Sequence, residues 1–368
     1  MTDPTRVRHI VFLLPGDLNA LTGGTLYDRR IIDGLRRRGW RVDLVALAPG
    51  FPWPDAAARD AAAGRVAALP DGSCVVADGL AFGAMPAIAQ QHAHRLRWVA
   101  LVHHPLALET GLDAAQRRQL FDSERHALAA ARGVIVTSVS TARALAAYDV
   151  SPERVRVVQP GTRPVLRATA RAARRRQATG ISLLCVASVT PRKGHADLID
   201  ALAGLQDRHW KLHCVGSLAR DPAAVHDLRA RIDAHGLGRR VVLHGELGHA
   251  ALQRHYAVAD AFVLASHHEG YGMALAEALA HGLPVVSTTA GAIADTVPAS
   301  AGMLVPPADV DGLRMALARL LDEPDWRASL AAGARAAAQQ LPRWPQAVTR
   351  FAEALDVLAD GTLTLDGR

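Results

Sequence analysis

The sequence is poor in aromatic residues and in cysteine. Aromatic side chains make up 4% of the 368 residues, and there are three cysteines, Cys74, Cys185 and Cys214. Their number is odd, their spacing matches no metal-ligand pattern, and each lies in or beside an apolar run. This excludes a disulfide-stabilised framework and favours buried thiols in a reducing compartment. With few aromatics, we expect a core of Ala, Leu and Val, as in folds that alternate strands and helices.

Long apolar runs are also missing. No segment reaches the roughly 20 apolar residues of a membrane-spanning helix, and the run from Ile10 to Leu14 is too short for a signal peptide. We therefore expect a cytoplasmic protein. Residues 1–180 carry 25 Lys and Arg against 15 Asp and Glu, whereas residues 181–368 carry 17 against 20. This basic excess fits a solvated linker, but it also fits peripheral contact with the inner face of a membrane or with an acidic acceptor.

The most informative stretch runs from Ser266 to Ser287. The preceding apolar residues 261–265 predict a buried strand, and residues 273–280 predict a short helix that Gly282 and Pro284 end. The polar loop between them contains two glycines. Free backbone N–H groups at the start of a helix bind anions, so a strand, a glycine loop and a helix in this order predict a phosphate site.

Two glutamates accompany this phosphate site. Glu269 lies in the loop and Glu277 lies about one turn into the helix. One interpretation is that Glu269 offsets the helix dipole and Glu277 is a solvated helix residue, and for either glutamate alone this is the better one. The other is that each carboxylate accepts hydrogen bonds from hydroxyl groups of the same ligand. A ligand with central phosphates and hydroxylated rings at both ends is a nucleotide sugar.

The complete string resembles a known signature, the E-x(7)-E motif of the retaining nucleotide-sugar glycosyltransferases of family 4. The match includes Gly270-Tyr271-Gly272, Glu277-Ala278, Gly282 and Pro284-Val285. The resemblance implies the GT-B fold, an α/β architecture of two Rossmann-like domains that face each other across a cleft, with a C-terminal helix that crosses back to the N-domain. We expect an acceptor-side domain at 1–162, a linker at 163–180, a donor-binding domain at 181–342 and the returning helix at 343–368.

The first half opens with a βαβ unit that has a glycine pair at its first turn. Strands are predicted at 9–14 and 40–47, with an amphipathic helix at 26–38. Gly23-Gly24 precede this helix in a loop that lacks the dinucleotide pattern G-x-G-x-x-G, so nicotinamide binding is not supported. A plain turn accounts for the two glycines. However, the family has paired glycines at this place, so the resemblance implies that their backbone contacts a donor phosphate.

Two histidines, His103 and His104, follow the strand predicted at 97–102. In open α/β sheets, ligands bind at the carboxyl ends of the strands. The alternative is that one or both histidines are simply polar loop residues, but the strand-end position favours a function for one of them. The resemblance implies that His103 lies near the sugar, and His104 is the alternative.

The second half restarts the pattern with a strand at 181–187 and the loop Arg192-Lys193-Gly194. Lys193 can reach a diphosphate as a point charge and Arg192 can bind it as a fork, although two solvated loop cations would give the same sequence. The loop resembles the donor loop of the family, in which the lysine holds the phosphates. The chain departs from the family at Ala187-Ser188, where Gly-Arg is frequent, so Arg192 is the candidate substitute.

Taken together, the resemblance implies a retaining, metal-independent transferase that moves a hexose-type sugar from a nucleotide diphosphate donor to a hydroxyl of a glycan, lipid or small-molecule acceptor. We expect no cofactor, no metal and no nucleic-acid partner. The candidate catalytic residues are Glu269, His103 and Lys193. The candidate donor site comprises Gly23, Gly24, Arg192, Lys193, Gly245, Leu247, Glu269, Gly270, Tyr271, Gly272, Met273, Ala274 and Glu277.

Three alternatives differ in chemistry. A nucleotide-sugar epimerase on the same fold would isomerise or hydrolyse the donor without an acceptor. A non-catalytic protein would only bind the donor. The missing family arginine mildly favours this, but the presence of Glu269, Glu277 and Lys193 argues against it. The carboxylate pair also fits a glycosidase, but its position beside a phosphate-type loop argues against that activity.

Overall fold

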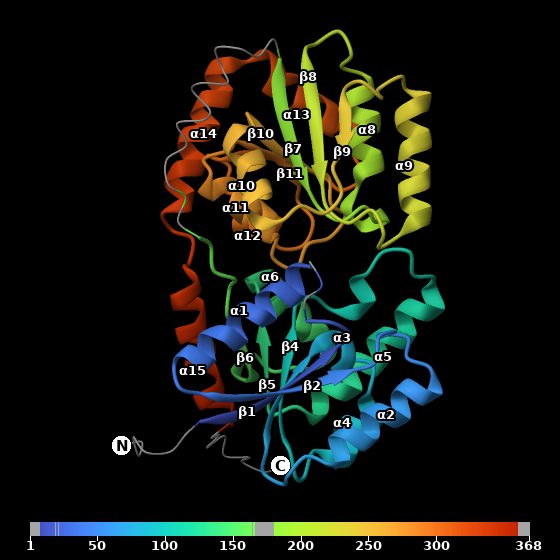
Figure 1. The fold of residues 1–368 in the computed structure, drawn as a ribbon, viewed down its shortest axis with the longest axis vertical. Helices are drawn as coiled ribbons and strands as arrows, with labels where there is room; N and C mark the ends of the chain where they lie inside the picture. The colour runs from blue at the N-terminus through green and yellow to red at the C-terminus, as the bar shows by residue number, and fades with distance from the viewer. Residues whose placement is uncertain (1–7, 19, 21, 164, 166–179, 360–368) are drawn as a thin grey trace. The chain divides into compact units, whose positions relative to one another are not determined.

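The computed structural model describes residues 8–18, 20, 22–163, 165 and 180–359. The chain divides into two compact units, Met1–Gly161 with Trp344–Arg368 and Thr162–Arg343 (Figure 1). Most of the predicted linker at 163–180 lies outside the described residues. Among the helices that are described, none is long and apolar enough to cross a membrane.

The first unit is a parallel sheet with the strand order β2-β1-β3-β4-β5-β6. Every position of β3 and β5 is buried, as expected for parallel strands that are covered on both faces. The strands are β1 (His9–Pro15), β2 (Arg41–Leu47), β3 (Cys74–Asp78), β4 (Arg97–Val102), β5 (Gly133–Val136) and β6 (Val155–Val157). The α-helices are α1 (Gly23–Arg37), α2 (Ala56–Ala67), α3 (Gly79–Phe82), α4 (Pro86–His92), α5 (Ala114–Ala130), α6 (Val139–Ala144) and α15 (Trp344–Ala359), and the 3-10 helices are η1 (Leu106–Leu108), η2 (Leu145–Tyr148) and η3 (Pro152–Arg154).

Helix α15 belongs to the first unit although it ends the described chain. It packs against α1, β4 and β5, and the ring of Phe351 is fully buried beside Phe12 and Tyr27. The two helices approach closely at Gly34, where a Cβ atom would stand 2.2 Å from Cγ2 of Val348. The predicted C-terminal helix that returns to the N-domain is therefore confirmed.

The second unit is another parallel sheet, with the order β12-β11-β10-β7-β8-β9. Its strands are β7 (Ile181–Val186), β8 (Trp210–Val215), β9 (Val241–Leu243), β10 (Ala261–Leu264), β11 (Val285–Thr288) and β12 (Gly302–Val305). Its helices are η4 (Pro191–Lys193), α8 (His195–Ala203), α9 (Pro222–Ala234), α10 (His249–Val258), α11 (Met273–Ala280), α12 (Ile293–Thr296), α13 (Val310–Asp322) and α14 (Pro324–Ala338). The core consists mainly of Leu, Val, Ala and Ile, as the composition predicts.

One local expectation is wrong. Gly23-Gly24 do not form a loop before the first helix, because α1 begins at Gly23. Thr22 is the N-cap and forms a capping box with Thr25: the Thr22 hydroxyl accepts a hydrogen bond from the Thr25 N–H, and the Thr22 N–H donates to the Thr25 hydroxyl, both at 3.2 Å. This reciprocal cap extends the helix to include the two glycines.

Candidate functional site

The loop between β10 and α11 positions Glu269. The loop ends at Gly272, which has a left-handed backbone with φ 84° and is the N-cap of α11. Glycine adopts this conformation without steric cost. Within the described part of the chain, this N-cap provides no side-chain hydrogen bond to the helix, so the first backbone N–H groups of α11 can bind an anionic ligand. The predicted limits of this helix, from Met273 to Ala280, are confirmed.

Lys193 and Glu269 form an ion pair in this frame. Nζ of Lys193 lies 2.6 Å from Oε1 of Glu269, and the hydroxyl of Ser266 donates a hydrogen bond to the same oxygen, also at 2.6 Å. Burial alone would raise the pKa of Glu269, but the charges of Lys193 and Arg192 together with these hydrogen bonds hold that pKa below its ordinary value. Glu269 is therefore ionised at neutral pH although its side chain is buried.

One glycine-dependent contact and two hydrogen bonds join the Lys193 turn to the Glu269 loop. Gly194 has φ 63°, and a Cβ atom there would stand 1.9 Å from the carbonyl oxygen of Ala265. Arg192 completes the junction, because its carbonyl accepts a hydrogen bond from the N–H of His267 and its guanidinium donates one to the carbonyl of His268, both at 2.8 Å. The cationic turn and the acidic loop are thus held as one structure.

Glu277 lies on α11 and is half-buried. Burial raises its pKa to about 6, although a hydrogen bond with Tyr256 and the charge of Arg163 act in the opposite direction. The Tyr256 hydroxyl also donates to the carbonyl of Ala274 at 3.2 Å. Glu277 therefore gains or loses a proton slightly below neutral pH, unlike Glu269.

The remaining predicted donor residues of this unit differ in exposure. Tyr271 is buried, burial raises its pKa to about 12, and its carbonyl accepts a hydrogen bond from Thr296. Gly245 has φ 70°, and its carbonyl accepts a hydrogen bond from the N–H of Gly216. Leu247 packs at the edge of the core. The ring of Tyr271 is thus part of the packing, whereas the turn at Gly245 is a backbone feature.

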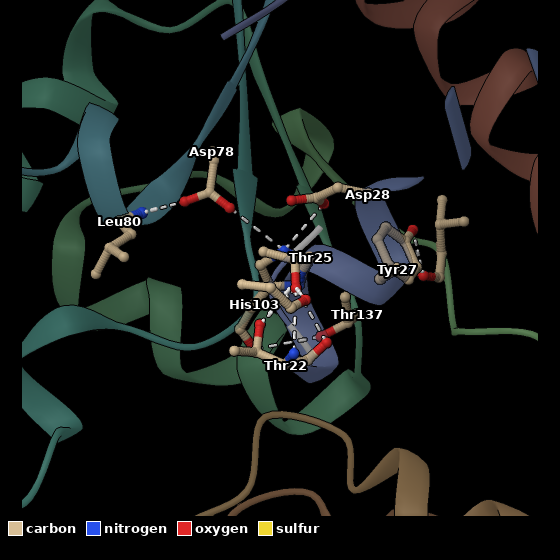
Figure 2. Close-up of polar contacts among 10 residues, drawn as sticks. Thr22, Thr25, Tyr27, Asp28, Asp78, Leu80, His103 and Thr137 are labelled. Atoms are coloured by element: carbon tan, nitrogen blue, oxygen red, sulfur yellow. Dashed lines mark hydrogen bonds and ion pairs between the residues drawn. The ribbon is translucent and has the colours of Figure 1, made fainter. Parts of the chain in front are cut away.

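In the first unit, His103 lies between two carboxylates (Figure 2). Its Nε2 atom is 3.2 Å from Oδ1 of Asp28 and 3.6 Å from Oδ2 of Asp78. Asp28 comes from α1, and Asp78 ends β3 beside the strand that leads to His103. His104 instead lies 3.4 Å from Glu109. Of the two histidines, His103 is the one that the fold joins to the glycine-containing start of α1.

The two aspartates keep His103 protonated. Burial alone would lower the pKa of His103, but Asp28 and Asp78 outweigh it and raise that pKa to about 10. Burial raises the pKa of Asp28 to about 6 against the effect of His103, and the second carboxylate adds to the rise. One imidazolium is therefore shared by two buried carboxylates at neutral pH.

Gly24 and Tyr27 complete the surroundings of His103. A Cβ atom on Gly24 would stand 3.3 Å from Cδ2 of the imidazole, and the ring of Tyr27 meets the imidazole edge-on at a centroid distance of 5.4 Å. The hydroxyl of Thr137 donates to the His103 carbonyl at 3.2 Å. The structure thus brings together two predicted site residues, Gly24 and His103.

Two regions of the chain match models of known protein families. Residues 180–323 match the family model described as "Glycosyl transferases group 1", and residues 73–165 match "Glycosyltransferase Family 4". The D-inositol 3-phosphate glycosyltransferase of Saccharomonospora viridis is 32% identical over 274 residues, which are 67% of this chain and 62% of that protein. That of Jonesia denitrificans is 31% identical over 69% of this chain and 65% of its own length. The chain spans less than two thirds of these relatives.

Solved structures resemble nearly the whole chain. Sucrose-phosphate synthase from Thermosynechococcus elongatus superposes with a TM-score of 0.77 over 94% of this chain and 98% of that chain, at 23% identity. The Anabaena protein HepE in complex with UDP and glucose gives a TM-score of 0.75 over 95% and 100%, at 19% identity. The chain has the GT-B glycosyltransferase fold. The two parallel six-stranded sheets are the two Rossmann-like domains of this fold.

Sequence patterns alone missed several residues of the two clusters in this GT-B chain. Asp78 is the last residue of a buried strand, so the rule that located His103 also applied to it. Asp28 lies one helical turn after Gly24, and the sequence alone does not distinguish it from the other charged residues of α1. Ser266 can be recognised as a site residue only from the structure of the loop, because its spacing in the sequence does not show that its hydroxyl reaches Glu269.

Proposed function

We propose that the protein is a retaining glycosyltransferase that moves a hexose-type sugar from a nucleotide diphosphate donor to a hydroxyl of a glycan, lipid or small-molecule acceptor. The observation that carries this proposal is the pair of Lys193 and Glu269, with 2.6 Å between Nζ and Oε1. The pair supports the proposal because a lysine can bind a diphosphate and the ionised glutamate beside it can accept hydrogen bonds from sugar hydroxyls. A nucleotide sugar presents both groups in one molecule.

In the proposed reaction, the bond between the anomeric carbon and the β-phosphate oxygen breaks, and its electron pair remains on the nucleoside diphosphate. The acceptor oxygen forms the new bond on the same face of the sugar, and its proton passes to the departing diphosphate. Lys193 and Arg192 stabilise the charge that develops on the leaving oxygen, with help from the N–H groups at the start of α11. We propose that these groups make a metal ion unnecessary in this step.

The other residues keep the roles that the family resemblance implies. We propose that Glu269 binds hydroxyls of the donor sugar and that Glu277 binds those of the ribose. The backbone near Gly245 and Leu247 is assigned to the base, and the backbone at Gly23-Gly24 to the donor phosphates. His103 is assigned to the sugar or the β-phosphate.

Known proteins suggest which compounds to test first. HepE is described in complex with UDP and glucose, so UDP-hexoses are the first donors to try. The curated relatives are named for D-inositol 3-phosphate, which makes phosphorylated polyols the first acceptors. A phosphorylated acceptor also suits the basic excess in residues 1–180.

The test uses radiolabelled UDP-hexoses with and without D-inositol 3-phosphate and a membrane extract. Label transferred to an acceptor supports the proposal. Label recovered as an isomer of the donor identifies an epimerase, and donor binding without turnover identifies a binding protein. Either of these results overturns the transferase.

The Glu269→Gln variant connects this activity to the site. It removes the carboxylate charge beside Lys193 and keeps the shape, so we expect kcat to fall about 100-fold or more with little change in folding. Glu353→Gln on the exposed face of α15 is the matched control and should keep wild-type activity. Near-normal turnover of Glu269→Gln would contradict the assignment.

A further inference from the structure

Three histidines from separate elements of the second unit converge at one place. His213 lies on β8, His244 follows β9 directly, and His255 lies on α10. Nδ1 of His213 is 2.9 Å from Nε2 of His244, and one nitrogen from each ring lies within 4.8 Å of the other two. The ring centroids are 4.5 to 5.7 Å apart. All three side chains are half-buried, so they are held in place and still reachable from solvent.

This spacing suits ligands of a transition-metal ion. Imidazole nitrogens bind zinc at about 2.0–2.1 Å in a tetrahedral arrangement, which places two such nitrogens about 3.3–3.4 Å apart. The His213 and His244 nitrogens are joined by a hydrogen bond of 2.9 Å, which an ion would replace, and the His255 nitrogen lies within 4.8 Å of both. Three imidazoles leave the fourth tetrahedral position to water.

The charged side chains nearest the cluster are cations, because Lys211 acts on His244 and Arg254 acts on His255. Lys211 and Arg254 repel a metal cation, so we expect weaker binding than at a thiolate zinc site.

We propose that His213, His244 and His255 bind a divalent transition-metal ion of the zinc type, outside the donor site. Because the three ligands belong to different elements, the ion would join β8, the end of β9 and α10. One of these positions adjoins a predicted donor residue, because His244 precedes Gly245. His255 precedes Tyr256, whose hydroxyl donates a hydrogen bond to the carbonyl of Ala274 in α11. The ion would therefore stiffen the part of the second unit around Gly245 and the start of α11, which is assigned to the base and the ribose. The metal proposal does not depend on which reaction the protein catalyses.

A second cluster could also bind a metal ion, so the experiment must distinguish binding there from binding to the three histidines. Cys185, His195 and Cys214 also place one ligand atom each within 4.8 Å, but all three are buried. His213 and Cys214 are neighbours on β8, so their side chains point to opposite faces of the sheet. A metal on the cysteines would show thiolate charge-transfer absorption, whereas a metal on the histidines would not.

The experiment titrates the chelator-treated full chain with Co²⁺ for absorption and with Zn²⁺ for calorimetry and thermal unfolding. We expect a single equivalent of Co²⁺ without thiolate absorption. Zn²⁺ at about 100 times its Kd should raise the Tm by roughly 3 °C or more. His255→Ala should weaken binding at least tenfold and abolish the shift. His226→Ala, an exposed histidine on α9, should bind as the wild type does. His255→Asn, which keeps a polar side chain of similar size, replaces His255→Ala should that variant fail to fold.

Three results would overturn the proposal. The first is wild-type Zn²⁺ affinity in His255→Ala or His255→Asn, and the second is no binding by the unmodified chain. The third is thiolate absorption that disappears in Cys214→Ala, which would place the metal on the cysteine cluster.

Discussion

The backbone of Glu269 lies directly against Gly291. Gly291 has φ 60°, and a Cβ atom there would stand 2.2 Å from the carbonyl oxygen of Glu269. The same carbonyl accepts a hydrogen bond from the N–H of Ala292 at 2.9 Å. The loop after β11 therefore supports the loop that carries the acidic side chain, and this support requires a residue without a side chain.

This contact predicts that Gly291→Ala is damaging. The variant must either shift the Glu269 backbone or leave the left-handed conformation, and such local strain costs on the order of 1–3 kcal/mol. We expect a lower Tm and weaker donor binding in isothermal titration. Gly238→Ala is the control, because Gly238 is exposed, has no positive φ, and a Cβ there meets no atom closer than 3.9 Å. Equal donor affinity in both variants would show that Gly291 does not position the loop.

Much of the second unit follows from local sequence patterns. The helix at Met273–Ala280 has its predicted limits, because Gly282 and Pro284 follow its end within a few residues. The Lys193 turn and the Glu269 loop were predicted as partners through the family resemblance. The ion pair is a consequence of β7 and β10 being neighbours in the sheet.

The three-histidine cluster shows why other features could not be predicted. His213, His244 and His255 are 31 and 11 residues apart and share no short motif. Only the pairing of β8 with β9 and the position of α10 bring them together. The start of α1 was misplaced for a different reason. Two glycines normally disfavour a helix, and the reciprocal cap of Thr22 and Thr25 overrides that preference.

Glu277 predicts a pH dependence of donor binding. Its pKa of about 6 is raised by burial, so below pH 6 the carboxyl becomes protonated and loses its ability to accept two strong hydrogen bonds from ribose hydroxyls. We expect KM for the donor to rise as the pH falls through about 6, with kcat less affected. Glu277→Gln should have a raised KM that no longer changes over this range. A KM that stays constant from pH 7 to pH 5 in the wild type would exclude this role.

The same group affects stability with the opposite trend. Between about pH 4.5 and 6, the folded protein retains a proton on Glu277 that the unfolded chain has lost, so this group makes folding less favourable as the pH rises. Glu277→Gln should remove that slope from the free energy of unfolding. The comparison separates the binding effect from a general loss of structure at low pH.

His103 predicts an alkaline loss of stability in the first unit. Its folded pKa of about 10 lies above the ordinary value of 6.5. Its contribution is therefore complete below about pH 6.5 and is lost progressively as the pH rises through about 10. We expect the unfolding midpoint to fall over this range in the wild type, and to fall less in His103→Gln. An NMR titration of the His103 ring gives the direct check, since deprotonation near pH 6.5 would show that the aspartates do not hold the proton.

Phe351 on the returning helix provides the last prediction. Its ring is fully buried in the first unit beside Phe12 and Tyr27, and Tyr27 in turn contacts His103. Phe351→Ala removes this packing, and buried Phe→Ala changes cost about 3–5 kcal/mol. Val357→Ala on the same helix is the control, because Val357 is 53% exposed and should change the free energy of unfolding by less than about 0.5 kcal/mol. Chemical denaturation of both variants measures the difference. Similar values for the two would mean that α15 adds little to the core of the first unit, whereas the expected contrast would show that the end of the chain stabilises the elements that hold His103.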